Sequence, residues 1–203
     1  MDGPVNMLTE TPADSPVGSG LTTYVASTDG HSIKVARAIL RRLGLPEDAF
    51  IRLKPKAPPP RLHADKPVLL VAPVRYGVHM PEADAVLAAW AAAPARPRLA
   101  FASVNLSARK PERRSAATNN YVRKALEKHR ITPDITHAIA GKLDYPKYST
   151  RDRLLIRLIM WMARGPTRGT EVIEYTDWDD VDAFADELPR VLGLPLPTEV
   201  AAG

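Results

Sequence analysis

The feature that most constrains the fold is an unbroken run of five apolar residues, Val68-Leu-Leu-Val-Ala72. A strand with one face in water alternates apolar and polar side chains, so an unbroken run predicts a strand covered on both faces. Elsewhere, short β-prone runs alternate with helical patterns, which predicts βαβ units, a parallel sheet and helices on both of its faces. The expected strands are 22–26, 50–53, 68–72, 98–104, 136–141 and 171–175, and the expected helices are 33–43, 81–93, 119–129 and 177–188.

Several helix ends carry recognisable signals. Gly44 stands where the C-terminal cap of the first helix belongs, and Pro81 suits the first turn of the second. Asp177 is a typical N-cap for the last helix.

Composition fits one soluble globular domain: the chain has 203 residues, of which 45% are hydrophobic and 25% charged. The lack of cysteine excludes a disulfide, a thiolate metal site and a cysteine nucleophile. A net charge of +5 favours anionic partners, namely a phosphate, a carboxylate, nucleic acid or a membrane surface. Composition does not choose among them.

We expect the ordered domain to span residues 21–195, with an insertion at 142–170. Residues 1–20 contain no Lys or Arg and no apolar core of a signal peptide, so they predict a flexible polar tail, and 196–203 predicts a second one. No apolar run approaches the roughly 20 residues that a membrane-spanning helix needs.

In doubly wound folds the ligand binds beyond the carboxyl ends of the strands, so the loops 27–32, 73–80 and 105–118 are the candidate site. The first places the hydroxyls of Ser27, Thr28 and Ser32 around one glycine at a helix start, which favours a phosphate. It is neither a Walker A loop nor a GxGxxG turn. The alternative is a plain turn capped by Ser32 or Asp29, whose carboxylate would repel a phosphate unless it points away.

The second loop, 73–80, offers the ring of Tyr76, the guanidinium of Arg75 and the imidazole of His79, and such a loop could stack on a flat ring. Alternatively, Tyr76 covers the sheet edge and Gly77 makes a turn. His79 has no second histidine or carboxylate at ligand spacing, so we predict no metal site.

The third loop and the helix after it concentrate positive charge. A solvated surface is the simplest interpretation of such a run, and anion binding is the alternative. Nucleic acid is disfavoured because residues 106–118 contain no aromatic side chain between the bases. The bases are Arg109, Lys110, Arg113, Arg114, Arg123 and Lys124.

Within the insertion, residues 151–164 have helical spacing, with Arg153, Arg157 and Arg164 on one stripe and a broad apolar face beside it. Trp161 borders the basic stripe. This pattern is typical of a helix in a membrane interface, and equally of a helix that packs on its own domain or on a dimer partner.

Several strings resemble the menaquinone-dependent protoporphyrinogen IX dehydrogenases, flavodoxin-like enzymes of late haem biosynthesis. The most specific are SVNLSARKPERR at 103–114 and TNNYVRK at 118–124. The resemblance covers about residues 21–190. It also includes Arg75-Tyr76-Gly77, Ala140-Gly-Lys-Leu-Asp-Tyr-Pro-Lys-Tyr148, Arg157-Leu-Ile-Met160 and Tyr175-Thr-Asp-Trp178.

The resemblance implies a flavodoxin-like, doubly wound, five-stranded parallel sheet of order 2-1-3-4-5, with FMN as cofactor. His31 replaces a neutral polar residue of the family, which predicts weaker, pH-sensitive phosphate binding, and Ala26 and Asp144 also depart from its pattern. The implied phosphate-binding residues are Ser27, Thr28, Asp29, Gly30, His31 and Ser32. The implied ring-binding residues are Pro73, Val74, Arg75, Tyr76, Gly77, Ser103, Val104, Asn105 and Leu106, with Asn105 at the flavin edge.

By the same resemblance the chain oxidises protoporphyrinogen IX to protoporphyrin IX, passes electrons to a quinone, and holds the substrate propionates with the six bases named above. Tyr76 and His79 are the weak candidates for a catalytic base. The expected location is cytoplasmic, with peripheral contact to the inner face of the plasma membrane through 151–164. The rivals are a flavodoxin-like electron carrier or quinone reductase without porphyrin activity, and a nucleic-acid-binding protein.

Overall fold

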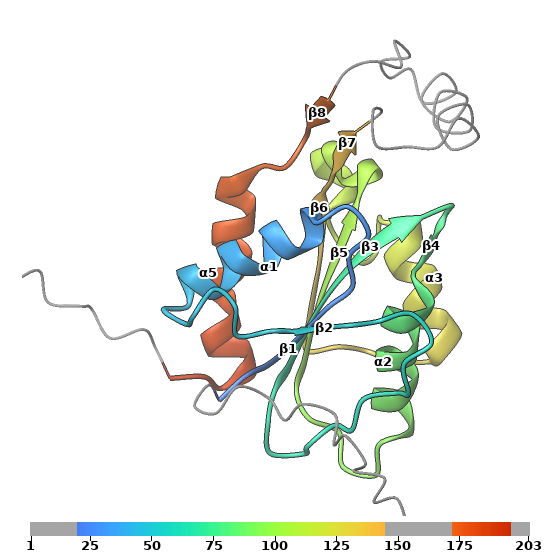
Figure 1. The fold of residues 1–203 in the computed structure, drawn as a ribbon, viewed down its shortest axis with the longest axis vertical. Helices are drawn as coiled ribbons and strands as arrows, with labels where there is room; N and C mark the ends of the chain where they lie inside the picture. The colour runs from blue at the N-terminus through green and yellow to red at the C-terminus, as the bar shows by residue number, and fades with distance from the viewer. Residues whose placement is uncertain (1–19, 145–171, 196–203) are drawn as a thin grey trace, which may run out of the picture.

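Five parallel strands form the central sheet, in the order β2-β1-β3-β5-β6 (Figure 1). The computed structural model describes residues 20–144 and 172–195. Counted along the chain without the short β4, the strand order is 2-1-3-4-5, and this prediction is confirmed. The strands are β1 (Thr22–Val25), β2 (Ile51–Arg52), β3 (Val68–Arg75), β5 (Leu99–Asn105) and β6 (Ile135–Ala140).

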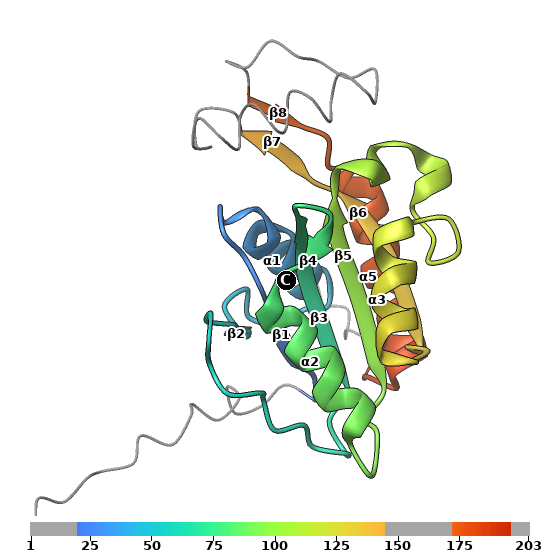
Figure 2. The ribbon, with the colours of Figure 1, turned by 90° about the vertical axis from the view of Figure 1, so that its right-hand side faces the viewer.

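Two of the described helices cover each face of the sheet (Figure 2). Alternate side chains of β3 enter two separate cores: Leu69 and Val71 pack with one helix pair, and Leu70 and Ala72 with the other. This is why the run is apolar at every position. The first pair is α1 (His31–Arg42) and α5 (Trp178–Leu192), and the second is α2 (Pro81–Ala92) and α3 (Asn120–His129).

The predicted capping residues take their places. Gly44, just beyond α1, has a φ of 70°, which a residue with a β-carbon rarely adopts. Asp177 caps α5, its Oδ1 accepting the backbone N–H of Asp180 at 3.3 Å. Pro81 is the first residue of α2, a position that suits proline because the N–H there would have no partner within the helix.

The segment 73–80 is not the simple loop that the sequence predicted. β3 continues to Arg75, and β4 (Val78–His79) returns antiparallel to it, with Val74 opposite His79. Tyr76 and Gly77 form the turn, with φ values of 51° and 82°. Two successive positive φ values define the mirror-image turn that matches the twist of a β-hairpin.

Beyond β5 and β6 the chain forms smaller elements at one end of the molecule (Figure 1). The segment 105–118 contains two 3-10 turns, η1 (Leu106–Arg109) and η2 (Pro111–Arg113). The strand expected at 171–175 is β8 (Val172–Glu174), which pairs antiparallel with β7 (Lys142–Asp144) outside the main sheet. The predicted amphipathic helix at 151–164 lies outside the described residues. Among the helices of 20–144 and 172–195, none has the length and apolarity to cross a bilayer.

Candidate functional site

The segments that follow β1, β3 and β5 gather at the carboxyl edge of the sheet (Figure 2). They are the loop before α1, the β3–β4 hairpin, and η1 with η2. The strand order reverses between β1 and β3, which is where doubly wound sheets bind ligands.

The loop between β1 and α1 is shaped to present hydrogen-bond donors. Gly30 has a φ of 88°, and apart from its two chain neighbours no residue comes within 4 Å of the place a β-carbon would occupy there. Ser27 Oγ accepts the Gly30 N–H at 3.0 Å, and the hydroxyl-bearing Thr28 beside it is exposed. The first bond of the helix runs from the Lys34 N–H to the Gly30 carbonyl, so the N–H groups before Lys34 remain outside the helical ladder. A helix start of this kind attracts an anion.

Asp29 points toward that helix start. Its Oδ1 accepts the backbone N–H of His31 at 3.1 Å, and it therefore occupies one of the donors that a phosphate would use. The structure thus combines the two alternatives from the sequence: Asp29 caps the first N–H, and the rest of the turn keeps its donors.

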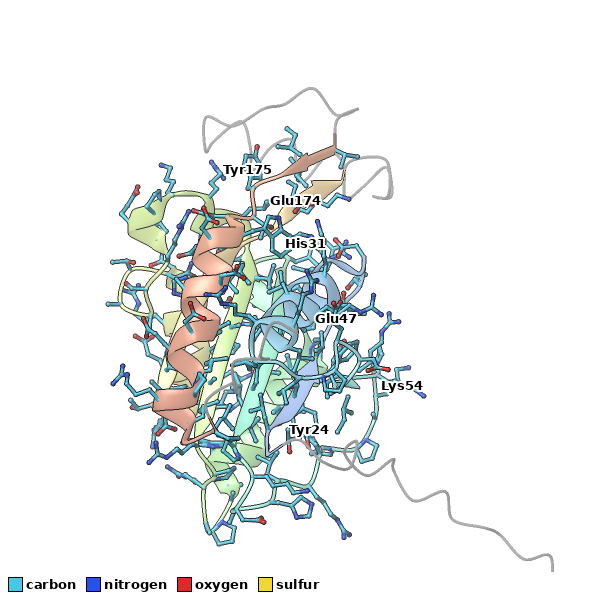
Figure 3. All side chains as sticks on the ribbon, turned by 90° about the vertical axis from the view of Figure 1, so that its left-hand side faces the viewer. Tyr24, His31, Glu47, Lys54, Glu174 and Tyr175 are labelled. Carbon is cyan, nitrogen blue, oxygen red and sulfur yellow. The ribbon has the colours of Figure 1, made fainter. Side chains whose placement is uncertain are left out.

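His31 links the same loop to the segment before α5. Its Nε2 lies 2.8 Å from Thr176 Oγ1, and that hydroxyl donates to the Ala140 carbonyl at 2.8 Å. Thr176 therefore accepts from the imidazole, which needs a proton on Nε2. Burial lowers the pKa of His31, against the charges of Glu174 and Asp29, which raise it. Figure 3 shows His31 and Glu174 at the same end of the molecule.

The tip of the β3–β4 hairpin is apolar and open. Tyr76 and Val78 are 64% and 63% exposed, and the Arg75 guanidinium lies 5.7 Å from the centre of the Tyr76 ring. His79 turns the other way: it is buried, packs against Phe101 and lies with Nε2 2.8 Å from Ser103 Oγ. Of the two candidate catalytic bases, only Tyr76 faces solvent.

Asn105 and Asn119 build the loop that follows β5. Asn105 Oδ1 accepts from Ser107 Oγ at 2.6 Å, the Ala108 N–H at 3.2 Å and Asn119 Nδ2 at 3.2 Å. Asn119, which is fully buried, caps α3 with its Oδ1 and donates from Nδ2 to the Arg113 carbonyl at 2.8 Å. The predicted bond from Asn105 to a flavin edge would compete with these internal bonds.

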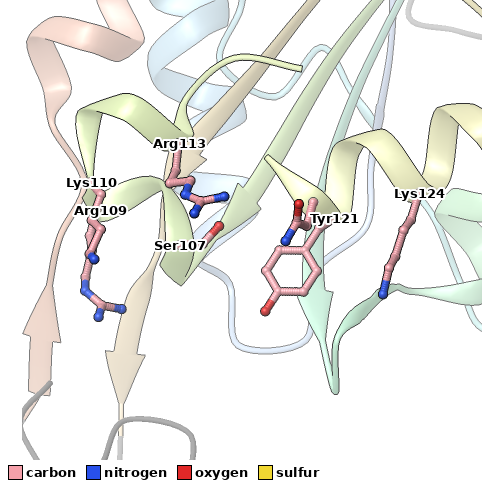
Figure 4. Close-up of a pocket in the computed structure, with 7 residues that line it drawn as sticks. Ser107, Arg109, Lys110, Arg113, Tyr121 and Lys124 are labelled. Carbon is pink, nitrogen blue, oxygen red and sulfur yellow. The ribbon is translucent and has the colours of Figure 1, made fainter. Parts of the chain in front are cut away.

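A basic pocket of about 440 Å³ opens between this loop and α3 (Figure 4). Tyr121 lies at its centre, with Arg113 on one side and Lys124 on the other. Four cationic side chains around one aromatic ring suit a ligand with carboxylate or phosphate groups. The lining residues are Ser107, Arg109, Lys110, Arg113, Asn120, Tyr121 and Lys124.

Two of the six predicted anion-binding bases do not line this pocket. The Arg114 guanidinium lies 3.0 Å from Asp177 and 3.3 Å from Asp180, so it ties the loop to α5 instead of facing a ligand. Arg123 bonds Asn120 Oδ1 at 3.1 Å on its own helix. Neither side chain lines this pocket, and their assignment to substrate stays a prediction.

A family model for the flavodoxin domain matches residues 23–170. The chain belongs to the flavodoxin-domain family. The predicted fold class is thereby confirmed, and FMN is the cofactor that this domain indicates. Among the described residues, no group of three or more His, Asp or Glu side chains could hold a metal ion.

Curated relatives confirm the resemblance to one branch of this family. The protoporphyrinogen IX dehydrogenase (quinone) of Escherichia coli (strain K12) is 47% identical over 96 residues, which are 47% of this chain and 53% of that protein. The protein of the same name from Leishmania major is 38% identical over 178 residues, 85% of this chain and 75% of that protein. The chain spans about half the length of the Escherichia coli relatives it matches.

One solved structure, the rubredoxin oxygen:oxidoreductase of Desulfovibrio gigas, aligns with a TM-score of 0.43 at 11% identity. The alignment covers 85% of this chain and 36% of that one, a likeness too weak to bear on function.

The residues of the flavodoxin-like loops fit FMN. The exposed Thr28 hydroxyl and the remaining N–H groups of the first turn of α1 can take the phosphate, and α1 has no acidic residue in that turn. The hairpin tip and the start of η1 stay the predicted binding segments for the flat ring. The Asp29 carboxylate is the one group of this loop whose charge opposes the phosphate.

The sequence did not indicate Tyr121, Asn119 or Thr176 as site residues. Tyr121 and Asn119 lie in TNNYVRK, a string that carries the family resemblance but from which only Arg123 and Lys124 were assigned to the site. A polar residue directly before a helix, followed by an aromatic one in its first turn, is a signal that could have drawn attention to both. Nothing local predicted that Thr176 would meet His31, because 145 residues separate them.

Proposed function

We propose that this chain oxidises protoporphyrinogen IX to protoporphyrin IX with FMN and passes the electrons to a quinone. The observation that carries the proposal is the basic pocket beside the predicted flavin-binding loops. Protoporphyrinogen carries two propionates, and a site that holds it needs fixed cations next to the cofactor. The names of the two relatives support both the substrate and the acceptor.

Within this proposal, Arg109, Lys110, Arg113 and Lys124 bind the propionates. Arginine suits this because its planar fork pairs a carboxylate through two bonds. The exposed apolar tip of the hairpin, Tyr76 and Val78, is suited to the non-polar part of the macrocycle. When bound, FMN supplies an acceptor for the electrons and protons that leave the macrocycle, and the quinone takes them in turn.

A flavodoxin-like electron carrier or quinone reductase is the second candidate. It would need the FMN loops but no porphyrin site, so the basic pocket argues against it. The cytoplasmic location, the membrane contact through 151–164 and a homodimer stay predictions.

Anaerobic turnover tests the proposal. FMN-loaded protein is mixed with protoporphyrinogen IX and menadione, and the fluorescence of protoporphyrin IX is followed. We expect product to form at a rate that depends on the quinone. Flavin that is reduced by a chemical reductant and reoxidised by menadione, without any porphyrin product, would support the electron carrier or quinone reductase.

Variants of the pocket sharpen the test. Because a hydrogen bond to a charged group contributes about 1.5–3 kcal/mol, Arg109→Ala or Arg113→Ala should raise the KM for protoporphyrinogen by about ten- to a hundredfold. Arg113→Lys should recover part of that loss. Arg37→Ala, an exposed change on α1 across the sheet, serves as the charge-matched control and should behave as the wild type. If a variant with alanine at both Arg109 and Arg113 keeps the wild-type KM, the pocket does not bind the substrate and is only a solvated surface.

A further inference from the structure

A hydrogen-bonded series of buried polar side chains connects the β3–β4 hairpin to the basic pocket. It starts at His79 on β4, passes through Ser103 and Asn105 on β5, and reaches Asn119 at the start of α3. All four residues are buried. Buried polar groups are costly unless they are bonded, so a connected set of four is a specific feature of the fold.

The direction of these bonds follows from counting donors. The Asn105 amide nitrogen lies 3.1 Å from Ser103 Oγ and can only donate to it. The Ser103 hydroxyl therefore has its own proton left to give, and His79 Nε2, at 2.8 Å, is the acceptor in reach. In this direction the imidazole carries its proton on Nδ1 alone, whereas a bond from Nε2–H to the second lone pair of Ser103 Oγ would need the other tautomer. Burial lowers the pKa of His79 to about 4, although the charge of Asp84 opposes this, so the ring is neutral at pH 7.

The far end of the series holds each segment that carries a pocket residue. Asn105 caps η1 through the Ala108 N–H, and Asn119 caps α3 through the N–H groups of Tyr121 and Val122. Asn119 also holds the Arg113 carbonyl at the end of η2. The positions of Arg109, Arg113 and Tyr121 therefore depend on two amides. The nitrogen of the first amide donates to Ser103 Oγ at 3.1 Å and to the Ser103 carbonyl at 3.3 Å.

We propose that His79 is a positioning residue: by accepting the Ser103 hydroxyl proton it fixes the Asn105 and Asn119 amides, and through them the geometry of the basic pocket. It touches neither substrate nor cofactor in this role. His79 thus couples the hairpin that flanks the cofactor to the loop that binds the anion.

The first test needs no ligand. A long-range ¹H–¹⁵N spectrum of the imidazole nitrogens, recorded near pH 7, reports which nitrogen of each histidine carries the proton. We expect the Nδ1–H form for His79. An Nε2–H form would reverse the Ser103 bond and overturn the proposal.

The second test compares porphyrin and FMN affinity, and rests on the proposed function. Protoporphyrin IX is titrated into FMN-loaded protein, and FMN into the apoprotein. His79→Phe fills the space beside Phe101 but cannot accept the Ser103 proton, so porphyrin binding should weaken about tenfold while FMN affinity stays within about twofold. His79→Gln restores an acceptor and should recover most of the porphyrin binding. His63→Phe, an exposed change, is the control.

A double-mutant cycle separates positioning from general loss of packing. Ser103→Ala removes the bond to His79 and also the bond from Asn105, so it should weaken porphyrin binding at least as much as His79→Phe. The double variant should be no worse than Ser103→Ala alone, because the His79 bond is already lost there. Additive losses, or unchanged porphyrin affinity in both single variants, would overturn the proposal. If the wild type binds no protoporphyrin IX, the proposed function fails, and the histidine tautomer decides this inference alone.

Discussion

At the scale of single residues, Asp29 determines how the loop before α1 receives an anion. Its carboxylate accepts the His31 N–H at 3.1 Å, so a negative charge already lies at the helix start. Helix N-termini favour one anion, and a second one nearby experiences repulsion. An FMN phosphate held by this loop, as predicted, would therefore bind against the charge of Asp29.

Removing that charge should tighten FMN binding. Asp29→Asn keeps an oxygen that can accept the His31 N–H, and repulsion near an exposed helix end is worth about 0.3–1 kcal/mol. We expect FMN affinity to rise about two- to fivefold in a fluorescence titration at low salt, and the gain to shrink as salt is added. Asp65→Asn, an exposed change in the 54–66 loop, should have no effect. Equal binding by Asp29→Asn would show that the carboxylate does not repel the phosphate, and weaker binding would show that it helps to hold the cofactor.

Two neighbouring arginines show what the sequence could predict at this scale. Arg113 and Arg114 are chemically equivalent in the string 103–114, and both were assigned to substrate. The structure places Arg113 in the pocket and Arg114 against Asp177. The partner of Arg114 comes from the cap of α5, 63 positions away, so local spacing could not separate the two.

At the scale of elements, Asp180 joins three parts of the molecule. From α5 it lies 2.9 Å from His137 Nε2 on β6 and 3.3 Å from Arg114 in the segment after η2. His137 also stacks on Phe184, with ring centres 5.4 Å apart. Asp180 therefore fixes the basic loop against both the sheet and its last helix.

The stability contributed by this contact should depend on pH. Burial alone would raise the pKa of Asp180, but the bonds and charges of His137 and Arg114 outweigh it and hold the pKa below its ordinary 3.8. A lowered carboxyl pKa stabilises the fold above pH 3.8, and this contribution is lost as the pH falls through the folded value. Asp180→Asn should cost about 1–3 kcal/mol in urea unfolding at pH 7.

The same comparison below pH 3.8 should show a smaller difference between variant and wild type. Asp179→Asn, its exposed neighbour, is the matched control. A difference that stays constant down to pH 3 would mean that the charge of Asp180 contributes nothing and that only its shape matters.

The elements themselves were largely predictable, because their signals are local. Val68 to Ala72 needed only its own apolar pattern, and Gly44 and Asp177 marked helix ends correctly. The β3–β4 hairpin was missed because the sequence Tyr76-Gly77 is not a typical signal for a mirror-image turn, as Asn-Gly is, although Tyr76 adopts a φ of 51°. Its strand pairing is a property of the folded sheet edge.

At the scale of the whole molecule, β7 and β8 bring the two ends of the segment 145–171 together. Lys142 lies opposite Glu174, and Asp144 lies opposite Val172. Residues 20–144 and 172–195 supply the sheet order and the two cores that the structure describes. The fold and the loops that fit FMN should therefore survive its removal.

Replacing 145–171 with Asn-Gly would join Asp144 to Val172 through a two-residue hairpin turn. We expect the shortened chain to bind FMN with unchanged affinity and to unfold within a few degrees of the full chain, as about 2–4 °C corresponds to 1 kcal/mol at this size. Flotation of both chains with anionic liposomes tests the predicted membrane contact of 151–164: only the full chain should float. Loss of FMN binding would contradict the first expectation, and flotation of both chains the second.

Because Asp144 pairs with Val172, the stability of the fold should depend only weakly on the length of the segment between them. Once the ends of a loop are held, doubling its length costs only about 0.6 kcal/mol. Descendants of such a chain can gain, lose or exchange material here without shifting the register of any strand in the main sheet. A flavodoxin-like domain can in this way acquire new attachments while its flavin-binding edge stays the same.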